Sequence, residues 1–98
     1  MKMPNSLKKI RLRGKVWKLE FVPRLDNGAY GECDEPDRPR KGIRIATNQS
    51  KSDMLDTVIH ELLHACLPDL SEDAVHDTAA DISCVLTRLG ARINSPDE

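Results

Sequence analysis

The sequence has few aromatic residues, few cysteines and no long hydrophobic run. Its aromatic residues are Trp17, Phe21 and Tyr30, so the core of any fold must be mostly aliphatic. The three cysteines are widely spaced and form no C-x-x-C pair, which argues against a zinc ribbon and a disulfide framework. No apolar run exceeds three residues, so we expect neither a signal peptide nor a membrane-spanning segment. We therefore expect a cytoplasmic protein that does not contact membranes.

Length and charge give further expectations. A chain of 98 residues buries too little surface for two separate cores, so we take residues 1–98 as one domain. Residues 1–24 hold eight lysines and arginines against one acid, Glu20, while residues 52–98 hold ten acids against Arg88 and Arg92. A basic N-terminus allows weak contact with nucleic acid. Basic residues that alternate with apolar ones are more often the exposed face of a strand.

Hydrophobic periodicity predicts an α+β fold with the sheet first. Residues 8–22 alternate around Gly14 and indicate two short strands or one bent strand. A short strand near Tyr30 and another over residues 42–47 complete a small sheet within residues 8–47. The sequence then predicts a helix over about 52–67, with its apolar stripe at Leu55, Ile59, Leu62 and Cys66. A second helix over about 71–89 has its stripe at Val75, Ala79, Ile82, Leu86 and Leu89, so the two form a helical hairpin.

The first predicted helix carries the motif HELLH at residues 60–64. Residues four apart lie on one face of a helix, so His60 and His64 can direct ring nitrogens at one zinc ion about 2.0–2.1 Å away. Glu61 lies about 100° around the helix, too far to join them as a close ligand. It is near enough to accept a proton from a water on the metal, which is the role of a general base.

A catalytic zinc needs a third protein ligand, which the second predicted helix must supply. With Val75 at the centre of its apolar stripe, Glu72 lies about 60° to one side and His76 about 100° to the same side. Glu72 is closer to the stripe and to the turn after His64, while His76 is the commoner kind of zinc ligand. Asp73 points nearly opposite to the stripe and is a weaker candidate. The periodicity alone leaves Glu72 and His76 both open.

The stretch IRIATNQSKSDMLDTVIHELLHACLPDLSEDAV, with GECDEP upstream, resembles the very small HExxH metallopeptidase-like proteins of phages and bacteria. These are similar in style to the SprT-like and ImmA/IrrE-like zinc peptidases, and the resemblance covers roughly residues 28–92. It implies a minimal zincin-like fold in which a strand leads into the HExxH helix and the next helix carries an acidic ligand near its start. Carried over, it implies His60, His64 and Glu72 as zinc ligands and Glu61 as the base.

The resemblance further implies a zinc-dependent peptidase-like hydrolase. Its substrate would be an extended peptide or protein, held by strand addition to an edge strand at residues 42–47. The alternative is a zinc-stabilised module without catalytic activity, which binds a protein or nucleic acid through its basic N-terminal strands. A glutamate between the two histidines favours the enzyme, because a purely structural site has no use for it.

Overall fold

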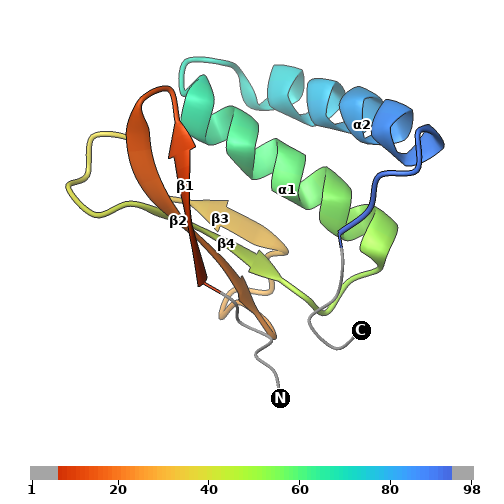
Figure 1. The fold of residues 1–98 in the computed structure, drawn as a ribbon, viewed down its shortest axis with the longest axis horizontal. Helices are drawn as coiled ribbons and strands as arrows, with labels where there is room; N and C mark the ends of the chain where they lie inside the picture. Colours follow the sequence, from red (N-terminus) through yellow and green to blue (C-terminus); the bar gives the residue numbers. More distant parts are fainter. Residues whose placement is uncertain (1–6, 94–98) are drawn as a thin grey trace.

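The computed structural model describes residues 7–93, which form a four-stranded sheet followed by two helices (Figure 1). The strands are β1 (Leu7–Leu12), β2 (Lys15–Val22), β3 (Gly31–Cys33) and β4 (Gly42–Ala46), and the helices are α1 (Lys51–Cys66) and α2 (Glu72–Arg88). The predicted α+β class, with a sheet before a helical hairpin, is confirmed. Each predicted helix is correct to within one residue at both ends.

The strand order in the sheet is β1-β2-β4-β3. β1 and β2 form an antiparallel hairpin, β2 pairs in parallel with β4, and β3 pairs antiparallel with β4. The prediction that residues 42–47 form an edge strand is therefore wrong, because β4 has a hydrogen-bonded neighbour on each side. The long connection from β2 to β4 allows their parallel pairing. β3, which lies within that connection, folds back to cover the other side of β4, so within residues 7–93 the sheet edges are β1 and β3.

The turn between β1 and β2 explains why residues 8–22 form two strands. Arg13 and Gly14 both have positive φ angles, 51° and 81°, which suits the tight two-residue hairpin turns that match the twist of the strands. The Arg13 guanidinium also donates a hydrogen bond to the Cys66 carbonyl oxygen, 2.8 Å away. This bond satisfies one of the carbonyls left unpaired at the C-terminus of α1 and ties the hairpin to that helix.

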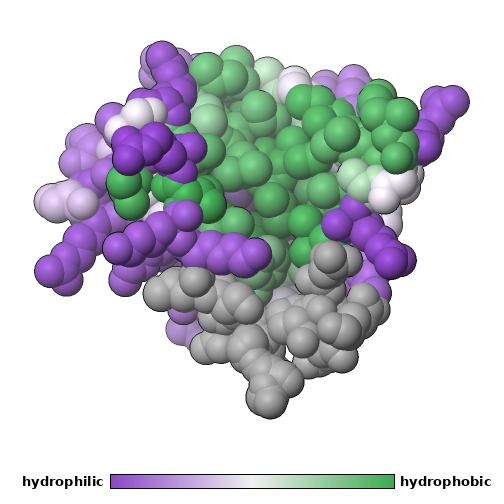
Figure 2. Space-filling model, in the orientation of Figure 1, coloured by the Kyte–Doolittle hydropathy of each residue, from purple (hydrophilic) through white to green (hydrophobic). Residues whose placement is uncertain are grey.

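α1 lies between the sheet and α2, so it is buried on two sides (Figure 1). Toward the sheet, the core contains Trp17, Ile43, Ile45, Met54, Val58 and Ala65. Toward α2, Leu55 and Ile59 pack with Ala79. Figure 2 shows hydrophobic side chains gathered over the middle of the view, where the helices lie, and hydrophilic ones over the β1–β2 hairpin and the loop at the left. Because α1 packs against the sheet on one side and against α2 on the other, each residue of the HELLH motif has a defined surrounding.

Neither helix in the described part of the chain combines the length and the apolar character that crossing a membrane requires.

Candidate metal centre

α1 places His60 and His64 one turn apart on the same face. The helix begins after Ser50, whose side chain accepts a hydrogen bond from the Asp53 amide, 3.0 Å away, and thereby caps the N-terminus. It then runs without interruption through the motif to Cys66. As a result the Nε2 atoms of His60 and His64 are 3.2 Å apart. Both rings are half-buried.

α2 brings Glu72 to the two histidines. Ser71 caps this helix by accepting a hydrogen bond from the Ala74 amide, so Glu72 is its first residue and follows directly after the turn from α1. The Glu72 Oε1 atom is 2.9 Å from His60 Nε2, and Oε2 is 3.3 Å from His64 Nε2. The carboxylate thus reaches both rings.

The three side chains together could hold a metal ion. One donor atom from each lies within 4.8 Å of the others. In a tetrahedral site with metal–ligand distances of about 2.0–2.1 Å, neighbouring donor atoms are about 3.3 Å apart, close to the separations of 2.9–3.3 Å between these groups. Two imidazole nitrogens and one carboxylate oxygen also match a known catalytic donor set.

The structure separates the two candidates for the third ligand. His76 lies one turn further along α2, is exposed, and does not belong to the group of donor atoms formed by His60, His64 and Glu72. Asp73 is likewise exposed and outside this group. The geometric reason is that Glu72 stands at the start of α2, where the chain has just left α1 and the two helices are joined by a short turn.

Glu61 lies on the face of α1 that is turned toward β3, beside the group formed by His60, His64 and Glu72. It is only 8% exposed. Burial raises the pKa of its carboxyl group, while the nearby His60 and His64 oppose that rise. Glu61 also lines a pocket of about 240 Å³, together with His64, Cys33 and Pro36. A carboxyl group with a raised pKa, beside both a candidate metal group and a pocket, is suited to exchange a proton with a bound molecule.

Cys33, in the same pocket, is poorly suited to be a nucleophile. Burial, with the nearby Glu61 and Asp34 carboxylates adding to it, raises the pKa of the Cys33 thiol to about 12. The thiol is therefore protonated near neutral pH, whereas nucleophilic attack requires the thiolate.

The sequence analysis did not single out Gly31, which lies directly against the Glu61 side chain. A Cβ atom at this position would come 3.0 Å from Cγ and from Oε2 of Glu61, and 2.6 Å from Cγ2 of Thr57. Its backbone does not have a positive φ angle, so glycine is needed here for space and not for conformation. Its place at the start of a three-residue strand was the only local signal, because glycine in a strand often marks a close approach.

We expect Gly31→Ala to lower the free energy of unfolding by about 1–3 kcal/mol, the usual cost of overpacking. Urea denaturation would measure the change. The matched control is Thr57→Ser, which removes Cγ2 and keeps the hydroxyl that lies 2.9 Å from Gln49 Oε1. Adding it to Gly31→Ala should restore part of the lost stability. A Gly31→Ala protein as stable as wild type would show that the strand moves aside without cost.

Comparison with known proteins identifies no relative: no protein-family model, curated protein or solved structure matches the chain.

Proposed function

We propose that the chain is a zinc-dependent peptidase, with His60, His64 and Glu72 as zinc ligands and Glu61 as the general base. The observation that carries this proposal is that neighbouring residues of α1 face different partners. Its two histidines meet a carboxylate from α2, while the glutamate between them is buried against β3. Three protein ligands leave a fourth position open for water or substrate, as in catalytic zinc sites.

In this reaction the three ligands would hold the zinc ion and Glu61 would transfer the proton. Zinc held there would lower the pKa of a water toward 7 and polarise the carbonyl of the scissile bond. Glu61 would accept a proton from the attacking water and pass it to the leaving amine nitrogen. Its burial supports this relay, because a carboxyl pKa nearer to the working pH both accepts and releases a proton readily.

β3 is the best place for an extended peptide to bind. Within residues 7–93 this strand has only β4 as a neighbour, so its other edge has backbone groups available for strand addition. Gly31, on this strand, lies against the Glu61 carboxylate, so a peptide paired with β3 would pass beside the base. In this proposal β3 takes the role that the sequence had assigned to residues 42–47.

The test is cleavage of a diverse peptide library by zinc-loaded protein, beside a known zinc peptidase as positive control. We expect cleavage that stops when a chelator removes the metal and returns when zinc is restored. Cleavage that persists without metal would contradict the proposal. So would zinc-loaded protein that cleaves nothing while the control does, and that result would favour the non-catalytic zinc-stabilised module.

A further inference from the structure

The face of the sheet opposite α1 carries an open pocket of about 400 Å³. Side chains alternate along a strand, so Lys18 and Arg44 point away from the core that Trp17, Ile43 and Ile45 form with α1. Lys9 is paired directly with Lys18 across the hairpin and shares that outer face. The loop between β3 and β4 supplies the opposite rim, including Arg40 and Lys41. The pocket is therefore separate from the candidate metal centre.

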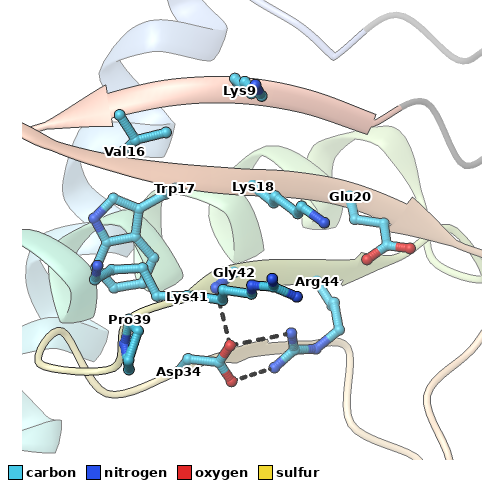
Figure 3. A pocket seen from close by; sticks show the side chains of 11 residues that line it. Lys9, Val16, Trp17, Lys18, Glu20, Asp34, Pro39, Lys41, Gly42 and Arg44 are labelled. Atoms are coloured by element: carbon cyan, nitrogen blue, oxygen red, sulfur yellow. Dashed lines mark hydrogen bonds and ion pairs between the residues drawn. The ribbon is translucent and has the colours of Figure 1, made fainter.

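The pocket has an excess of positive charge. Its lining contains five basic side chains and two carboxylates, Glu20 and Asp34. Asp34 is already engaged: it accepts hydrogen bonds from the Arg44 guanidinium at 2.7 Å and from the Gly42 amide at 2.9 Å (Figure 3). Its hydrogen bond with Arg44 lowers the pKa of Asp34, so this carboxylate stays charged and neutralises Arg44. Arg44 also pairs with Glu32.

The remaining basic side chains are Lys9, Lys18, Arg40 and Lys41. Lys41 lies over the Trp17 ring, with its ammonium nitrogen 5.8 Å from the ring centroid. In the described part of the chain, no carboxylate lies within ion-pair distance of the other three. Lys9 and Lys18 stand directly opposite each other on neighbouring strands, an arrangement that is unfavourable for like charges. An anion bound between them would relieve this repulsion.

We infer that this pocket binds the phosphate backbone of a single-stranded nucleic acid. The unpaired cations come from β1, β2 and the β3–β4 loop, so they surround an opening and can meet several phosphates in succession. We expect a single strand, because its flexible backbone can bend to follow the cations around a pocket of about 400 Å³. Trp17 is only 1% exposed and offers no surface for base stacking. Binding should therefore depend on the backbone and be insensitive to sequence.

The experiment uses a fluorescently labelled oligothymidylate of about 16 nucleotides and follows its anisotropy on titration with the full chain at several salt concentrations. With three to four phosphate contacts, we expect the logarithm of the affinity to fall against the logarithm of salt concentration with a slope of about −2 to −3. Lys18→Ala should make this slope shallower by about 0.7. An affinity that does not change with salt would overturn the inference.

Two charge-reversal variants distinguish binding in this pocket from non-specific attraction to the positive charge of the protein. Lys18→Glu lies in the pocket, whereas Arg24→Glu makes the same change on an exposed residue that follows β2 outside it. We expect Lys18→Glu to weaken binding by at least about tenfold and Arg24→Glu by less than about threefold. Thermal unfolding would verify that both variants fold. Equal weakening by the two would overturn the inference. So would a poly-glutamate peptide that competes as well as unlabelled oligothymidylate, because the pocket would then suit an acidic protein equally.

Discussion

Glu61→Gln is expected to keep zinc bound and to lower peptide hydrolysis by about 10²- to 10⁴-fold, the range attributed to a positioned general base. Glutamine has nearly the same shape, so it fits the buried space between α1 and Gly31. It cannot accept a proton from water, however. Because the Glu61 carboxylate is buried and its pKa is raised by that burial, replacing it with a neutral amide should leave stability unchanged or increase it.

This combination of results distinguishes a base from a structural residue. Activity should fall while the free energy of unfolding and the zinc content do not. Glu35→Gln is the matched control, because it removes the same charge from an exposed residue that lines the same pocket. We expect it to keep most of the activity. Measurements of cleavage rate, zinc content and urea denaturation on the three proteins would decide. A Glu61→Gln protein that is fully active would remove Glu61 from the mechanism.

The position of Glu61 shows what helical periodicity can and cannot predict. The sequence analysis expected one apolar stripe on α1, through Leu55 and Ile59. The structure has a second one, with Met54, Val58 and Ala65 facing the sheet, because α1 is packed between two layers. Glu61 falls on this second stripe, three residues after Val58. A carboxylate in line with buried aliphatic residues was therefore a signal in the sequence, visible once two stripes are considered.

Hydrophobic periodicity could not predict the order of the strands in the sheet. The alternation in residues 42–47 predicts correctly which side chains share a face, and it holds for Ile43 and Ile45. It does not say which strands lie on either side, because pairing depends on contacts between distant segments. For the same reason the sequence could not place Gly31 against Glu61, thirty residues away. The capping serines, in contrast, act locally, and both helices begin directly after a serine.

The sequence narrowed the third zinc ligand to Glu72 or His76, and the structure places only Glu72 beside the two histidines. Replacing each residue in turn therefore tests the proposed site. We expect wild-type protein to contain one zinc per chain, His76→Ala to retain it, and Glu72→Ala to bind zinc more than about a hundredfold more weakly. Loss of a residue that merely orients a ligand already costs about 10- to 100-fold. The two variants are well matched because both side chains are exposed residues near the start of α2, so neither truncation creates a cavity. Elemental analysis and zinc titration would measure the difference.

Thermal unfolding provides an independent measurement of the same site. Zinc that binds only the folded chain stabilises it by about 2.7 kcal/mol at a hundred times its dissociation constant. For a domain of this size, that corresponds to a rise in Tm of roughly 10–20 °C. Wild type and His76→Ala should show this rise and Glu72→Ala should not. Glu72 also favours the N-terminus of α2 by about 0.3–1 kcal/mol, but that contribution is present with or without zinc and cancels in the comparison. If His76→Ala alone lost the rise, His76 would be the ligand. If wild type showed none, HELLH would be a coincidence of helix composition.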